Sequence, residues 1–139
     1  MPLSRDEARR LIDAAQARAA QIGIKVTVAV VDEGGLLFAL SRMDGAPPLS
    51  SQVAEAKASG AALTLRDGAA MAQMFQERPG FFAVITKLTR LPAVPGPGSA
   101  LIKRDGAVLG AVGVSGGTSD EDEICAIEGI KAAGLTHKV

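Results

Sequence analysis

The sequence predicts an α/β fold of the α+β type, in which an antiparallel sheet of four to five strands is flanked by helices. Two segments have the pattern of β-hairpins, and helical patterns precede, separate and follow them. Hairpins that bury apolar residues under helices favour an antiparallel sheet packed in layers with those helices. The 139 residues contain no internal repeat and no linker-like stretch, so we expect one domain spanning residues 1–139.

The chain begins with a helical pattern and a hairpin pattern. Ser4 and Glu7 match a capping box, and apolar residues recur at helical spacing from there to Ile22. A β-branched run at residues 25–31 and a second apolar run at residues 36–42 are separated by two acidic residues and two glycines. This arrangement is typical of two strands joined by a turn.

The middle of the chain is expected to be helical. A loop with a Pro-Pro pair leads to a second helix, capped by Ser50 or Ser51 and ending near Leu65. One face of this helix consists of alanines and glycine, which lets another backbone approach closely. Asp67 is expected to cap a third, shorter helix that ends near Pro79.

For two further segments the sequence predicts no definite helix or strand. The apolar residues 81–88 fit either a helical turn or a strand. Residues 91–99, which include Gly96 and Gly98, are rich in proline and glycine, so we expect them to be irregular.

A second hairpin and a last helix complete the pattern. Strands at residues 100–104 and 107–115 are joined by Asp105-Gly106, which favours a two-residue turn because both turn positions take positive φ. Thr118 or Ser119 is expected to cap the final helix. The expected buried stripe of that helix consists of Ile124, Ile127, Ile130 and Ala133.

The composition argues against several partners. Fifteen basic and fifteen acidic residues give a formal net charge of zero, and aromatic residues make up only 3% of the chain. Such a chain has no basic field and few stacking platforms for nucleic acid. It has no apolar signal core at its start and no apolar run close to the roughly 20 residues that span a bilayer. We therefore expect no nucleic-acid partner, no membrane association and a cytoplasmic location.

The scarcity of cysteine and histidine excludes hydrolase chemistry of the triad type. Cys125 is the only cysteine, and its apolar surroundings indicate a buried structural thiol. His137 is the only histidine and belongs to a C-terminal tail that we expect to be mobile. Neither a Ser-His-Asp nor a Cys-His arrangement can be built from these residues. The acidic residues 120–123 point to different faces of a helix and lack a histidine, so no metal site is expected.

Four segments form a series that covers much of the chain. They are Val30-Val31-Asp32-Glu33-Gly34-Gly35, Ser41-Arg42-Met43-Asp44-Gly45-Ala46, Ala54-Glu55-Ala56-Lys57-Ala58, and Gly110-Ala111-Val112-Gly113-Val114-Ser115-Gly116-Gly117 followed by Asp120-Glu121-Asp122-Glu123. In this order and spacing they resemble the GlcG/HbpS family, which includes the C-terminal domain of PduO-type proteins. The resemblance implies a profilin-like domain, a homo-oligomer, and haem binding or haem breakdown. Other members of the family belong to catabolic operons, glycolate use among them.

The resemblance and the residue chemistry select a first group of candidate site residues. Arg42 offers a planar fork for a carboxylate, either a haem propionate or a small organic acid. The alternative is a local ion pair with Asp44, or a backbone cap, with Met43 packed beside it. Lys57 either holds an anion or acts as a nucleophile or base, or it covers alanines with its stem and keeps its ammonium in water. Arg42, Asp44 and Lys57 are thus the candidate catalytic residues.

A second group of candidate ligand contacts lies in the glycine-rich segments. Gly96 and Gly98 lie where the family usually has a Gly-Gly pair. Ser115 and Gly116 precede the last helix, whose N-terminal N–H groups favour an anion. Acidic residues in the first turn already complement the dipole of that helix, so helix stabilisation is the alternative. Gly113 marks a place where either a helix or a flat ligand lies against the strand.

Three functions remain open at this point. The first is an oligomeric protein that binds haem or a related tetrapyrrole and aids its degradation. The second is an enzyme or accessory protein that acts on a small organic acid in a catabolic pathway. The third is a protein without a ligand that uses its small helix face for assembly. Haem is the one cofactor that the sequence suggests. The common iron ligands are His, Cys, Met and Tyr. Because the chain has no Tyr, a Cys expected to be buried and a His expected in a mobile tail, Met43, Met71 and Met74 are the candidate ligands.

Overall fold

The computed structural model describes residues 1–137, and the helices and strands in them follow the predicted order. The four strands pair antiparallel in the order β2-β1-β4-β3. The predicted α+β fold with an antiparallel sheet is therefore confirmed. In chain order the elements are α1 (Arg5–Ile22), β1 (Thr27–Asp32), β2 (Leu37–Arg42), α2 (Leu49–Thr64), α3 (Gly68–Glu77), α4 (Pro79–Ile85), β3 (Ser99–Arg104), β4 (Ala107–Ser115) and α5 (Ser119–Ala132).

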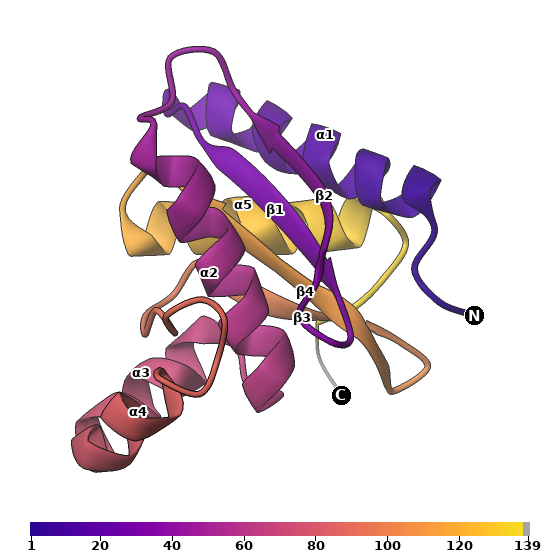
Figure 1. Ribbon diagram of the computed structural model, residues 1–139. Coiled ribbons are helices and arrows are strands. Elements are labelled where there is room, and N and C mark those ends of the chain that lie inside the picture. Colours follow the sequence, from indigo (N-terminus) through magenta and orange to yellow (C-terminus); the bar gives the residue numbers. More distant parts are fainter. Residues whose placement is uncertain (138–139) are drawn as a thin grey trace.

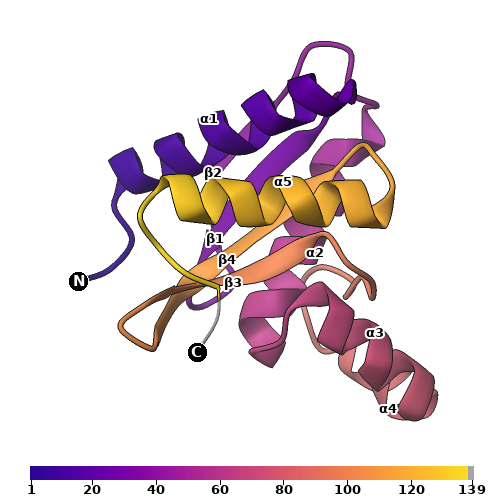
Figure 2. The same cartoon turned by 180° about the vertical axis from the view of Figure 1, so that it is seen from behind.

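Helices cover both faces of the sheet. Helices α1 and α5 lie side by side on one face, whereas α2 lies on the other, with α3 and α4 projecting beyond one end of α2 (Figures 1 and 2). The core under α1 and α5 includes Val28 and Val30 of β1, and the core under α2 includes Val31 of the same strand. Alternate residues of a strand point to opposite faces, so a central strand buries both sets. Within residues 1–137 no helix combines the length and apolar character needed to cross a membrane.

The N-termini of α1 and α5 are capped as the sequence predicts. The Ser4 N–H donates to Glu7 Oε1 at 2.9 Å, and the Glu7 N–H donates to Ser4 Oγ at 3.1 Å. Thr118 and Glu121 make the same exchange in front of α5. Each capping box satisfies N–H groups that no helical carbonyl reaches, so these two helix starts are determined locally.

At α2 and α3 the predicted side-chain capping bonds do not form. Neither Ser50 nor Ser51 caps α2, which follows Pro48 without a side-chain cap. The Ser50 hydroxyl is buried and lies 2.7 Å from Thr27 Oγ1 of β1. Asp67 is the N-cap residue of α3, as predicted, but its side chain makes no capping bond, because its carboxylate accepts the N–H of Leu101 in β3 at 2.8 Å. In both cases the side chain that the local pattern assigns to the helix N-terminus forms its hydrogen bond with a residue of the sheet instead.

The remaining local predictions differ in outcome. The ambiguous residues 81–88 include most of α4, and Asp105-Gly106 forms the predicted turn with φ values of 52° and 82°. The predicted stripe of α5 is wrong at Ile124, which is 45% exposed. Ile130 and Ala133 of that stripe are buried as predicted. The buried residues of α5 also include Asp122, Cys125, Ala126 and Gly129.

Helix α2 comes closest to the sheet at Gly113 of β4. A Cβ atom on Gly113 would collide with the carbonyl oxygen of Ala54 and lie 2.7 Å from the backbone nitrogen of Ala58. Both alanines are fully buried. The small helix face predicted from the sequence therefore packs inside the chain, and a helix rather than a flat ligand lies against Gly113.

Gly113→Ala should destabilise the protein because an added methyl group forces α2 away from β4. Overpacking of this kind typically lowers the free energy of unfolding by about 1–3 kcal/mol. Urea denaturation followed by circular dichroism measures the change. Gly80→Ala is the matched control, since a Cβ atom on Gly80 meets no atom within 4 Å. Equal stability of Gly113→Ala and wild type would show that α2 can shift without loss of packing.

Candidate functional site

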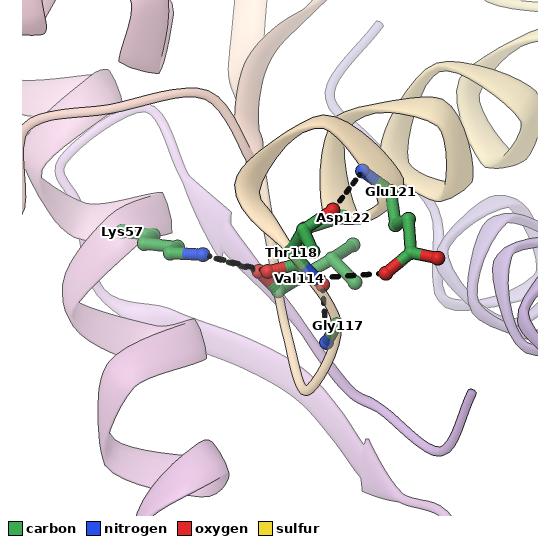
Figure 3. A network of polar contacts seen from close by, with 6 residues as sticks. All are labelled: Lys57, Val114, Gly117, Thr118, Glu121 and Asp122. Atoms are coloured by element: carbon green, nitrogen blue, oxygen red, sulfur yellow. Dashed lines mark hydrogen bonds and ion pairs between the residues drawn. The ribbon is translucent and has the colours of Figure 1, made fainter.

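Lys57 extends from the contact between α2 and β4 to the start of α5. Its ammonium donates to the carbonyl oxygen of Val114 at 2.9 Å and to Oδ2 of Asp122 at 3.0 Å (Figure 3). The side chains of Lys57 and Asp122 are 9% and 3% exposed. The alternative in which Lys57 covers alanines with its stem and keeps its ammonium in water is therefore wrong. The ammonium forms a buried ion pair that joins the helices on opposite faces of the sheet.

The acidic residues at the start of α5 satisfy the N–H groups of that helix end. The second oxygen of Asp122 accepts the Gly117 N–H at 2.9 Å, and Glu121 accepts the Thr118 N–H at 2.9 Å (Figure 3). The carboxylates also place negative charge where the helix dipole favours it. This geometry favours helix stabilisation over capture of an external anion.

The structure brings Gly98 and the end of β4 to the ion pair. A Cβ atom on Gly98 would lie 2.8 Å from Lys57 Nζ, and the φ of 122° at Gly98 also favours glycine. The carbonyl oxygen of Gly98 accepts the Val114 N–H at 2.8 Å. Ser115 pairs with Thr27 of β1. A ligand-binding role for Gly96, Gly98, Ser115 and Gly116 stays a prediction.

Arg42 caps its own loop. Its Nε and Nη2 atoms both donate to the carbonyl oxygen of Ala46, at 3.1 and 2.8 Å. Asp44, in the same loop, is exposed. Within residues 1–137 no hydrogen bond or ion pair links Arg42, Asp44 and Lys57, so the three candidate catalytic residues do not form one polar cluster.

An apolar groove, here called the α2–α4 groove, lies between the C-terminal half of α2 and helix α4. Its volume is about 340 Å³. Of the candidate ligand and catalytic residues predicted from the sequence, only Met74 lines this groove. The small helix face, through Gly60, and the ambiguous apolar run at residues 81–88 also contribute to its lining. The residues that matter for its chemistry are Leu63, Arg66, Met74, Phe81, Ile85 and Leu88.

The three candidate methionines lie in different surroundings. The Met43 sulfur accepts the N–H of Val26 at 3.4 Å and packs against the core under α1 and α5. Met71 is fully buried in the core under α2. Met74 is 6% exposed and lines the α2–α4 groove, with the exposed Arg66 beside it. Met74 is therefore the one candidate sulfur of the three that lines this groove.

Comparison with known proteins assigns the chain to a family. A family model described as haem degrading protein HbpS-like matches residues 3–131. The chain belongs to the HbpS-like family. It is similar to Protein GlcG of Escherichia coli strain K12, with 37% identity over 113 residues that cover 81% of each chain. The resemblance to the GlcG/HbpS family, stated from the four segments, is thereby confirmed.

Solved structures of HbpS-like proteins share the fold over nearly the whole chain. The crystal structure of a PduOC complex with haem superposes with a TM-score of 0.90, at 27% identity and with all of both chains covered. The crystal structure of HbpS superposes with a TM-score of 0.84, at 29% identity, and covers 94% of this chain and 89% of HbpS. The elements that form the α2–α4 groove thus belong to a fold that the family shares.

The thiol and the imidazole of this HbpS-like chain lie away from the α2–α4 groove. Cys125 is fully buried in the core under α1 and α5, where burial and the charge of Asp122 raise the pKa of its thiol to about 11. Next to His137, Thr136 exchanges two backbone hydrogen bonds with Lys103 of β3, so the chain is paired up to Thr136, and the mobility of His137 itself stays a prediction. Within residues 1–137 no cluster of three or more His, Cys, Asp or Glu side chains is arranged to hold a metal ion.

Asp122→Ala should destabilise the protein strongly because it leaves the Lys57 ammonium buried without its counter-ion. Removing one partner of a buried ion pair typically lowers the free energy of unfolding by about 3–5 kcal/mol. Urea denaturation measures the loss. Arg90→Ala is the matched control, since it removes an ion pair between α2 and a 62% exposed Arg90 side chain, for which about 1 kcal/mol or less is expected. A similar small loss in both variants would contradict a structural role for the buried pair.

Cys125 should resist thiol reagents in the folded protein. The thiolate is the reactive form, and a pKa of about 11 keeps the thiol protonated at pH 8. Labelling with iodoacetamide, followed by mass spectrometry, should therefore be negligible without urea and complete in urea. Rapid labelling of the folded protein would show that the α1–α5 core opens readily.

Proposed function

We propose that this protein binds haem or a related tetrapyrrole as a homo-oligomer, and that the tetrapyrrole lies in the α2–α4 groove. The observation that carries the proposal is an apolar groove that combines a thioether and a guanidinium, in a chain that superposes along its whole length on a haem-bound PduOC.

The lining of the groove suits the flat apolar faces of a porphyrin. Leu63, Phe81, Ile85 and Leu88 come from α2, α4 and the turn after α4. Burying a ligand face against such side chains stabilises the complex by roughly 25 cal/mol per Å² of apolar surface removed from water. Leu63, Phe81 and Leu88 are 47%, 44% and 79% exposed, so a tetrapyrrole there could keep its polar edge hydrated.

Two polar groups of the groove suit the iron and the propionates. Met74 lines the groove, and methionine is one of the common haem-iron ligands. Arg66 also lines the groove and is exposed; one of its nitrogens donates a hydrogen bond to the Thr64 carbonyl at 3.1 Å. A guanidinium binds carboxylates in a forked geometry, which suits a propionate. Haem bound there would supply an iron centre for redox or oxygen chemistry.

The small-carboxylate alternative has weaker support from the geometry. Its candidate residues were Arg42, Asp44 and Lys57. Arg42 donates to Ala46 and Lys57 donates to Asp122, so both cations already have partners inside the protein. Exchanging those partners for a ligand would leave a carbonyl and a buried carboxylate unsatisfied. The observations therefore favour haem as the ligand.

Haem titration tests the proposal. Hemin should bind saturably with a change in the Soret band. Met74→Leu should alter that band because it removes the sulfur at nearly constant volume, and Arg66→Ala should weaken binding by about 1.5–3 kcal/mol, as expected for a hydrogen bond to a charged group. His137→Ala and Met43→Leu are the controls and should leave the titration unchanged. Absence of saturable binding would contradict the haem proposal. Loss of binding in His137→Ala would show that haem binds near the C-terminal segment and not in the α2–α4 groove.

Degradation is the finer part of the proposed function. The same complex, kept in air with a reductant, should lose its Soret band faster than free hemin under the same conditions. If the Soret band decays no faster with the protein than without it, the protein binds haem but does not degrade it.

A further inference from the structure

We infer that the free edge of β2 is the surface through which two copies of this chain pair, with their β2 strands antiparallel about a two-fold axis. This inference names the interface of the homo-oligomer in the proposed function. It would join the two four-stranded sheets into one continuous sheet. It does not require that haem be bound.

The two edges of the sheet differ in their backbone hydrogen bonding. On the β3 edge, Lys103 exchanges two backbone hydrogen bonds with Thr136, at 2.7 and 3.1 Å. On the other edge, the Met43 N–H donates to the Val26 carbonyl of the β1 segment at 3.0 Å. Alternation along an antiparallel pair then directs the N–H and C=O groups of Leu40 and Arg42 away from β1. Such unpaired groups are a template for another strand.

The β2 edge also carries apolar side chains that the chain does not cover. Leu37, Phe38 and Leu40 are 47%, 44% and 37% exposed. Helix α2 packs mainly over β4 and β1, so β2 extends beyond it (Figure 1). Soluble proteins usually protect an edge strand with lysine, proline, an inward-pointing charge or a bulge. The segment 37–41 has none of these residues. Its pairing with β1 shifts between Val30 and Val31 but is regular from Ala39 to Arg42, so this stretch of the edge can pair with another strand.

The charged side chains of α1 beside β2 are arranged so that, under a two-fold rotation, those of one copy complement those of the other. Arg5, Arg9 and Asp13 of α1 line a shallow groove along residues 39–41 of β2. Antiparallel pairing of two β2 strands reverses the direction of one α1 relative to the other. The Arg5–Arg9 end of one groove would then face the Asp13 end of its partner, as an isologous interface requires. The formal net charge of zero adds no long-range repulsion between copies.

A charge exchange on α1 tests the pairing in the full chain. The variants are Asp13→Arg, the double variant Arg9→Asp with Asp13→Arg, and the control Glu128→Arg on an exposed position of α5. Sedimentation velocity over a range of concentrations gives the dissociation constant, and melting temperatures report any loss of folding. Hydrogen exchange of the Leu40 and Arg42 amides reports directly on the β2 edge.

Wild type should sediment at twice the chain mass of 14.2 kDa or at a higher even multiple, with the Leu40 and Arg42 amides protected. Asp13→Arg should raise the dissociation constant by about tenfold or more, because like charges then face each other, and should expose both amides. The double variant should restore pairing, and the Glu128→Arg control should match wild type. A monomeric wild type would overturn both the oligomer and its interface. Pairing that survives Asp13→Arg with both amides exposed would overturn the β2 edge alone, and hemin binding would be unaffected in either case.

Discussion

The close contact between α2 and β4 is the constraint on which the other features of this HbpS-like chain depend. A helix can approach a strand this closely only where the strand has no side chain, at Gly113, and where the helix presents methyl groups, at Ala54 and Ala58. The approach brings Lys57 to the end of β4, so that its ammonium reaches both Val114 and Asp122. A packing contact on one face of the sheet thereby allows an ion pair to the helix on the other face.

The same contact places the polar groups that stabilise the fold and the proposed ligand groove at opposite ends of α2. At the start of α5, Lys57 pairs with Asp122, and Asp122 and Glu121 accept the backbone N–H groups of Gly117 and Thr118. In the proposed function the ligand binds at the other end of α2, in the α2–α4 groove formed with α3, α4 and the following turn. Apolar surface with one thioether and one guanidinium suits a flat, dianionic ligand better than a small carboxylate.

Local sequence patterns predicted those features that local atoms determine. The capping boxes at Ser4 and Thr118 and the turn at Asp105-Gly106 depend on residues no more than three positions apart, and all are present. The capping bonds expected of the Ser50 and Asp67 side chains do not form, because these side chains bond to Thr27 and to the N–H of Leu101 instead. A polar side chain near a helix start has several partners within reach, and only the packing of the sheet decides among them.

The sequence alone determined the order of the elements, the antiparallel character of the sheet and the family, because hydrophobic periodicity, turn residues and the four quoted segments are all properties of contiguous residues. Only the tertiary structure decided what Lys57 does, since its partner Asp122 lies 65 residues away and a buried charge requires that partner. The α2–α4 groove was likewise out of reach of the sequence. Its walls come from three helices and a turn, and a concave apolar surface exists only once their packing leaves apolar side chains uncovered.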